Sequence, residues 1–149
     1  MLEHRFRAIV AMLTLGLMLA SPASARARTC SATEATSADA QLDHLDTWAK
    51  VASNFRRFGH CDDGSIAEGN SEAIARLLID HWDTTPTLVR LIKRDPRLQQ
   101  FVLRHIDETL DTGDIEKIGR LASSNCAAAA SSLCKEFRLK VGRLQSVSN

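Results

Sequence analysis

The sequence has little of what would divide a chain or hold it in a membrane. Its 7 glycines and 3 prolines among 149 residues do not gather into a linker, so a second, separately tethered domain is not expected. The apolar run of residues 8–20 is shorter than the roughly 20 residues that a bilayer-spanning helix needs. Tyrosine is absent and aromatic residues make up 5% of the chain, so basic stretches interleaved with aromatics are missing.

An excess of charge of one sign is also missing. The chain has 19 lysines and arginines against 18 acidic residues, and without residues 1–25 both numbers are 17. A neutral domain has no general attraction to nucleic acid or to an anionic membrane, and we expect neither as a partner. Local clusters of like charge, such as residues 107–116, are read as solvated helix faces.

The N-terminus has the three parts of a secretory signal peptide. Arg5 and Arg7 precede the apolar run, and the small residues Ala23-Ser24-Ala25 follow it. We therefore predict a signal peptide over residues 1–25, with a second cleavage site two residues later. Removal of this segment leaves no stable membrane anchor. The signal peptide implies an exported protein, which we expect to be periplasmic, with secretion as the alternative.

The exported part is long enough for one domain with a core of its own. Residues 26–38 are small and polar, with almost nothing to bury, and are predicted to form a flexible arm. Residues 39–149 are predicted to form a single helical domain. No cofactor is expected, because phosphate-binding glycine loops and metal-binding motifs are absent.

Apolar residues recur every three or four positions through that domain, which is typical of amphipathic helices. The first stripe runs from Leu42 to Phe58, and both tryptophans, Trp48 and Trp82, lie among apolar residues and are predicted to be core. Thr85-Pro86 and Asp95-Pro96 each place a capping residue before a proline, as at a helix start. Further helix starts are predicted at Ser65 with Glu68, at Ser71 and at Asp114. The prediction is all-α: a compact orthogonal bundle of about five to six short helices, reinforced by two disulfides.

Four cysteines remain after cleavage, an even number that indicates two disulfides in an oxidising compartment. Three connectivities are open, and we favour Cys30–Cys61 with Cys126–Cys134, because each pair closes a local loop. The second pair requires a break in the helix between its members, since eight residues of helix span about 12 Å. A zinc site made of the same four thiols is the rival interpretation, but it lacks a C-x-x-C pair.

No catalytic motif is present, and we expect a protein that is not an enzyme. The chain has no G-x-S-x-G elbow, no H-E-x-x-H, and no serine or cysteine visibly beside a histidine and an acid. One alternative is a metal-binding or metal-responsive periplasmic domain. Its candidate ligands are His60, Asp62 and Asp63, in the turn after the first predicted helix, and His81, near the end of the next one.

In size, leader and cysteine use, though in no motif, the chain resembles the helical periplasmic immunity proteins of bacterial toxin systems. That resemblance implies a binding factor, an inhibitor or an immunity-type protein, whose partner is another envelope or extracellular protein. Loops on a rigid scaffold commonly carry recognition, so the acidic turn between the first two predicted helices is the candidate contact. Its candidate binding residues are Asp62, Asp63, Glu68 and Glu72.

Overall fold

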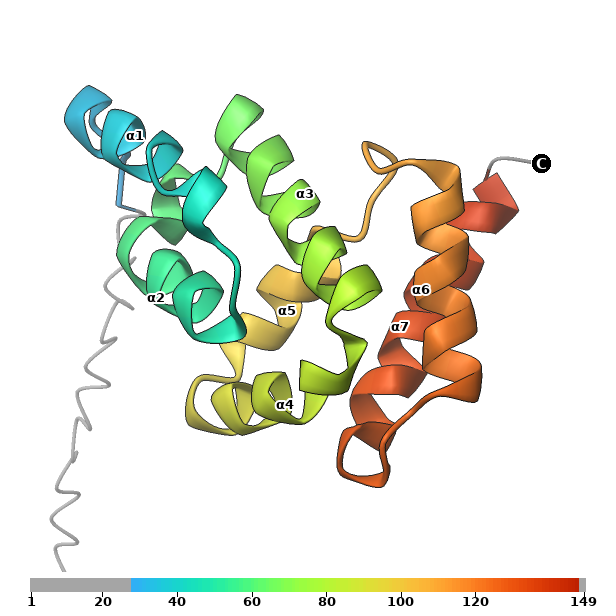
Figure 1. Cartoon of the computed structure of the whole chain (residues 1–149). Coiled ribbons are helices and arrows are strands. Elements are labelled where there is room, and N and C mark those ends of the chain that lie inside the picture. The colour runs from blue at the N-terminus through green and yellow to red at the C-terminus, as the bar shows by residue number, and fades with distance from the viewer. Residues whose placement is uncertain (1–27, 148–149) are drawn as a thin grey trace, which may run out of the picture.

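The computed structural model describes residues 28–147, and these residues are all-helical, as predicted (Figure 1). Within that range there are seven α-helices, and no residue lies in a β-strand. The predicted signal peptide, residues 1–25, lies outside the described residues. Among residues 28–147, no helix combines the length and the apolar character that crossing a bilayer requires.

The α-helices are connected by short loops and by four 3₁₀ turns. The helices are α1 (Ala32–Asp39), α2 (Trp48–Phe58), α3 (Gly64–Asp80), α4 (Thr85–Arg94), α5 (Arg97–Arg104), α6 (Thr112–Ser124) and α7 (Ser131–Val147). The 3₁₀ turns are η1 (Leu42–His44), η2 (Gly59–Cys61), η3 (Trp82–Thr84) and η4 (Ala128–Ala130).

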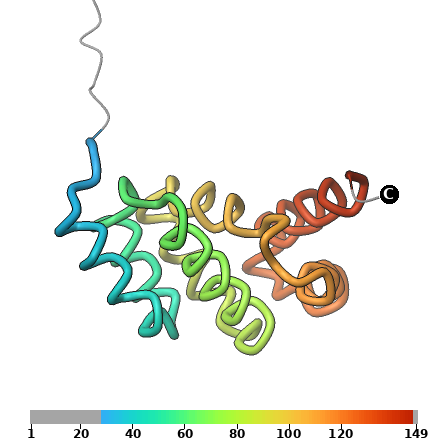
Figure 2. Tube along the Cα trace, turned by 90° about the horizontal axis from the view of Figure 1, so that it is seen from above, coloured from blue at the N-terminus to red at the C-terminus, as the bar shows by residue number. Residues whose placement is uncertain are grey.

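The first and last helices lie at opposite ends of the molecule, and α4 and α5 return to pack beside α2. Figures 1 and 2 show α1 and α2 at one end, α3 in the middle, and the α6–α7 pair at the opposite end. One large apolar cluster reaches from α2 to α7, and it contains Trp48 and Trp82, which confirms that both are core. A smaller cluster, with Phe58 and Ile66, lies under α1.

The segment predicted as a flexible polar arm is partly a helix, α1. Ser31 and Glu34 form a reciprocal capping box: the Ser31 hydroxyl accepts from the Glu34 amide, and the Glu34 carboxylate accepts from the Ser31 amide. Ala38 is fully buried against the smaller cluster. The segment folds because its few alanines meet that cluster and a disulfide anchors its start, neither of which its composition reveals.

The apolar stripe from Leu42 to Phe58 is not one helix. The backbone leaves the helical region at Leu45, and Thr47 begins α2 by accepting a hydrogen bond from the Lys50 amide. The preceding turn, η1, lays Leu42 across α3 at Gly69, where an added Cβ would come within 2.5 Å of the Leu42 side chain. The glycine therefore permits a close approach rather than interrupting α3.

Several predicted caps are displaced by a few residues. Asp63, not Ser65, begins α3, and α3 continues through Ser71, which was predicted to start a helix and is instead buried. Asp111, rather than Asp114, caps α6 through the Gly113 amide. In each case another oxygen lies closer to the free amides of the first turn.

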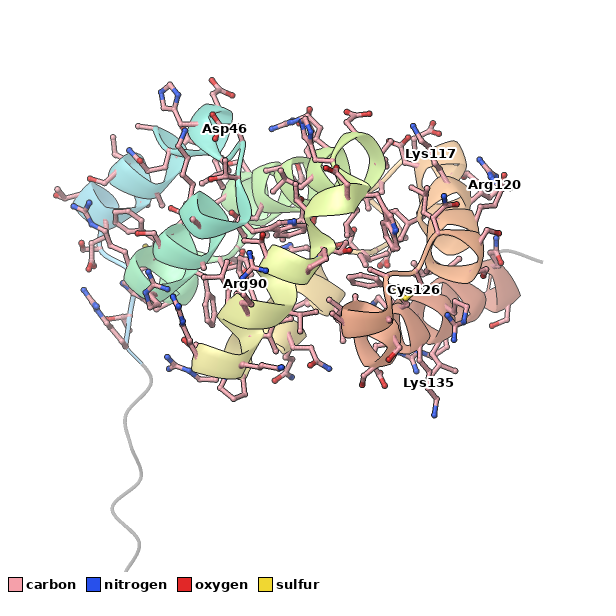
Figure 3. All side chains as sticks on the ribbon, turned by 60° about the horizontal axis from the view of Figure 1, so that its bottom comes forward. Asp46, Arg90, Lys117, Arg120, Cys126 and Lys135 are labelled. Atoms are coloured by element: carbon pink, nitrogen blue, oxygen red, sulfur yellow. A yellow bond between two sulfur atoms is a disulfide. The ribbon has the colours of Figure 1, made fainter. Side chains whose placement is uncertain are left out.

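Both predicted disulfides are present, Cys30–Cys61 and Cys126–Cys134. The second pair has its Cα atoms 6.2 Å apart. That separation is reached because the chain is extended at Ala127 and then turns through η4, so the alanine run does not continue α6 into α7. Figure 3 shows Cys126 at this turn between α6 and α7.

Candidate functional site

A groove of about 1010 Å³ lies between α3 and α6 and is also lined by residues 109–111 of the loop between α5 and α6. Ala75 and Ile79 of α3 contribute apolar surface to it. Its polar lining is dominated by carboxylates: Glu68, Glu72, Asp80, Asp111 and Asp114. Two basic residues, Arg76 and Lys117, also line it, and Figure 3 labels Lys117 on α6.

The groove keeps a surplus of negative charge after its internal ion pairs are counted. Arg76 Nη1 lies 2.8 Å from Glu72 Oε1, and Lys117 Nζ lies 4.0 Å from Asp80 Oδ1. Within residues 28–147, Glu68, Asp111 and Asp114 have no basic group within 4.0 Å. Three carboxylates are therefore available to a cationic partner.

Behind the groove lies a buried polar network centred on Asp62. The Asp62 side chain is 3% exposed and accepts a hydrogen bond from Asn70 Nδ2 at 2.9 Å. Arg104 donates to the same carboxylate, and His105 Nε2 lies 3.1 Å from it. An ionised carboxylate only accepts, so this contact places a proton on His105 Nε2. Asp62 thus joins α3 to the end of α5.

His105 continues the network on its other side. Its ring is 2% exposed, packs edge-on against Phe101 with centroids 4.5 Å apart, and places Nδ1 2.9 Å from Ser71 Oγ. Ser71 Oγ also lies 3.1 Å from Asp107 Oδ2 and 3.1 Å from the Ala67 carbonyl. The single hydroxyl hydrogen therefore has two oxygen acceptors within reach, and the role of His105 Nδ1 depends on the protonation of the ring. A nucleophilic role would need this hydroxyl to face a substrate, and Ser71 is 2% exposed.

Hydrogen bonds of Asp107 join α3 to the loop that precedes α6. Asp107 Oδ2 accepts a hydrogen bond from the Ser71 hydroxyl of α3, while Oδ1 accepts one from the Thr109 amide at 2.9 Å. Thr109 and Asp111 line the groove, and Asp111 caps α6. Side-chain hydrogen bonds therefore link the α3 wall of the groove to the loop that leads into α6.

The electrostatics of the network oppose protonation of its carboxylates. Burial by itself would raise the pKa of Asp62, but the hydrogen bond and charge of His105, with Asn70 and Arg104, outweigh it and hold that pKa below its usual value. Burial would also raise the pKa of Asp107, but hydrogen bonds from Thr109 and Ser71 outweigh it and lower that pKa.

These shifts predict acid sensitivity of the fold. In the unfolded chain both carboxyls titrate near pH ~3.9, so below that pH the unfolded state binds more protons than the folded state. The stabilisation is complete above this value and is lost as the pH falls through the lower folded pKa values. We expect the Tm to fall steeply below pH ~4, and the fall to be shallower in Asp107→Asn. Thermal unfolding followed by circular dichroism measures both, and identical acid profiles would contradict the prediction.

The predicted contact residues fall in different places. Glu68 and Glu72 line the groove. Asp62 is buried, so it supports the site from behind rather than touching a partner. Asp63 caps α3 through the Gly64 amide and lines a separate hollow beside α1.

The predicted metal ligands are not brought together as a set. His60 lies 3.2 Å from Glu34, Asp62 is in the buried network, and His81 ends α3. Within residues 28–147, the one group of three or more His, Cys, Asp and Glu with ligand atoms mutually within 4.8 Å contains none of Asp62, Asp63 and His81. The structure therefore offers no support for the predicted set.

The partners of Asp62 lie far from it in the sequence and were not predicted. Ser71 and His105 are 34 positions apart, and Asp62 and His105 are 43 apart. No local spacing connects them, and only the packing of α3 against α5 does so. The repeated His-x-Asp pattern at residues 81–83 and 105–107 was visible, but nothing in it distinguished the buried His105 from the exposed His81.

Comparison with models of protein families, with curated proteins and with solved structures found no significant match to this chain.

Proposed function

We propose that this chain is an exported protein-binding factor, of the inhibitor or immunity type, that holds a basic segment of another envelope protein in the groove between α3 and α6. The observation that carries the proposal is the uncompensated negative charge of the groove, with Glu68, Asp111 and Asp114 free of basic neighbours among the described residues. Lysine and arginine side chains are the protein groups that this surface attracts.

The charge and the rigidity of the groove both favour binding of a basic segment. A recessed surface of one sign focuses its field and speeds the encounter with an oppositely charged partner. The hydrogen bonds of Asp107 tie α3 to the loop that precedes α6, which lowers the ordering cost of binding in the groove. Ala75 and Ile79 add apolar surface that the aliphatic parts of lysine and arginine can cover.

The two disulfides are compatible with an exported protein, and residues 1–25 have the pattern expected of a signal peptide. In an oxidising compartment no cysteine of this chain is a nucleophile, since all four are bonded. A surface that binds, rather than one that reacts, therefore agrees best with the chemistry at hand.

Reversal of the groove charge tests the proposal. In Glu68→Lys/Glu72→Lys we expect affinity for the partner to fall at least tenfold, because the uncompensated Glu68 becomes repulsive and the loss of Glu72 leaves Arg76 without its ion-pair partner in the groove. Partners captured from the envelope fraction by wild type are identified, purified and titrated against both proteins by calorimetry. The wild-type Kd should also rise with salt, because the contacts are between charges at a solvated surface.

A matched control variant makes the same change of net charge on a surface outside the groove. Asp39 and Asp43 are exposed and lie outside the groove lining, so Asp39→Lys/Asp43→Lys alters net charge equally. This variant should bind as wild type does. If the groove variant binds the partner with wild-type affinity, the groove is not the binding site. If both variants bind the partner equally weakly, the loss comes from the change in net charge and not from the groove.

A further inference from the structure

A second cluster of chemically active side chains lies at the opposite end of the molecule, where α1 meets η2. Ligand atoms of Glu34, His60 and Cys61 all lie within 4.8 Å of one another. Cys61 Sγ is bonded to Cys30 Sγ, so a fourth donor atom belongs to the same place. One imidazole nitrogen, one carboxylate oxygen and one sulfur thus lie close together, and the second sulfur is bonded to the first.

This donor set matches a known coordination preference. Zn²⁺ is held tetrahedrally by four ligands drawn from cysteine thiolate, histidine nitrogen and carboxylate oxygen, at about 2.0–2.3 Å each. His60 Nε2 is buried, lies 3.2 Å from Glu34 Oε1, and makes no well-aligned hydrogen bond within residues 28–147. A buried nitrogen in that state is suited to coordinate a metal ion.

In the oxidised protein the two sulfurs are joined and neither is a thiolate. We propose that reduction of the Cys30–Cys61 disulfide converts this cluster into a zinc site with Cys30, Cys61, His60 and Glu34 as ligands. The reductant is a dithiol: it transfers two electrons and two protons to the S–S bond, becomes a disulfide itself and leaves two thiols. Binding of Zn²⁺ then releases the two thiol protons to solvent.

The surroundings allow the ion to enter. A hollow of about 450 Å³ beside the cluster is lined by Cys30, His60 and Cys61. Cys30 is exposed and precedes the first residue of α1, so it can move to complete a tetrahedron. Arg28, which pairs with Glu34, has a side chain that is 66% exposed and can leave the carboxylate to the metal.

The capping box of α1 fixes the position of the Glu34 carboxylate beside His60. This carboxylate accepts a hydrogen bond from the Ser31 amide at 3.1 Å and one from the Ser31 hydroxyl at 2.9 Å, both through Oε2. Its other oxygen, Oε1, is the one that lies 3.2 Å from His60 Nε2.

The other disulfide provides an internal comparison. Cys126 and Cys134 belong to no group of three metal-ligating side chains among the described residues. If paired thiols alone sufficed, both pairs would bind zinc on reduction. The proposal requires the first pair to bind more tightly, because His60 and Glu34 complete its coordination.

The test compares oxidised protein with protein reduced by a phosphine, which adds no competing thiol. We expect one Zn²⁺ per reduced chain by native mass spectrometry and none per oxidised chain. Added zinc should protect Cys30 and Cys61 from alkylation and leave Cys126 and Cys134 reactive. In His60→Asn and in Glu34→Gln the Kd for zinc should rise at least about tenfold, a loss that even outer-shell changes at zinc sites produce.

Glu34→Gln keeps the capping hydrogen bond of α1, and His81→Asn serves as the control, because His81 lies outside the cluster. The control should bind zinc as wild type does. Absence of zinc binding, equal protection of both cysteine pairs, an unchanged Kd in both ligand variants, or a helix content that is lost on reduction and not restored by zinc would each overturn the proposal.

Discussion

Asp62→Ala is expected to lower the free energy of unfolding by about 3 kcal/mol, because it removes the acceptor on which a buried network converges. His105 and Asn70 would each keep a donor in a site where they are 2% and 3% exposed. Arg104 contributes less to this loss, since its side chain is 56% exposed and can return to water. Urea unfolding at pH 7 measures the change.

The neighbouring aspartate is the natural control. Asp63 is exposed and accepts one hydrogen bond, from the Gly64 amide at the start of α3. Asp63→Ala is expected to cost about 1 kcal/mol, the usual value for a helix cap. If Asp62→Ala and Asp63→Ala lower the free energy of unfolding equally, the buried network contributes no more stability than a helix cap. The network would then not be what holds the groove in shape.

Phe137→Ala is expected to cost about 3–5 kcal/mol, the range found for large aromatic residues in well-packed cores. Phe137 is fully buried on α7, and its ring centroid lies 6.0 Å from that of Trp82. Trp82 in turn donates a hydrogen bond to the Asn125 carbonyl, at the end of α6. The cavity would therefore open where the α6–α7 pair meets the rest of the bundle, and α6 is a wall of the groove.

Leu139, two residues further along α7, is 47% exposed and provides the comparison. Leu139→Ala should change stability by no more than about 0.5 kcal/mol, as is usual for surface positions. Thermal and urea unfolding of the two variants test the difference. A small effect of Phe137→Ala would mean that α7 is not held to the bundle by this contact.

The helical class, both disulfides and the burial of both tryptophans were predicted from the sequence, because each leaves a periodic or pairwise pattern in the chain. Helix boundaries were less predictable. Asp63 and Asp111 are the caps where Ser65 and Asp114 were expected, since the choice among nearby oxygens depends on backbone geometry. The helix α1 was missed because its stability comes from Ala38 packing on another part of the chain.

The candidate site was predictable only in part, for the same reason. Glu68 and Glu72 were identified from local charge, and they line the groove. The buried role of Asp62 was not apparent, because an aspartate in a polar turn looks the same in sequence whether it faces water or His105. Contacts that join distant segments follow from packing, and one sequence carries no direct record of them.

The two disulfides have a mechanical consequence for the groove. One joins the start of α1 to η2, and the other closes the turn between α6 and α7, so each reinforces one extremity of the molecule. The groove lies between these extremities, and no covalent cross-link spans it. Neither disulfide would therefore resist a change in the width of the groove, which is set by the non-covalent contacts between its walls, such as the Ser71–Asp107 hydrogen bond and the Lys117–Asp80 ion pair.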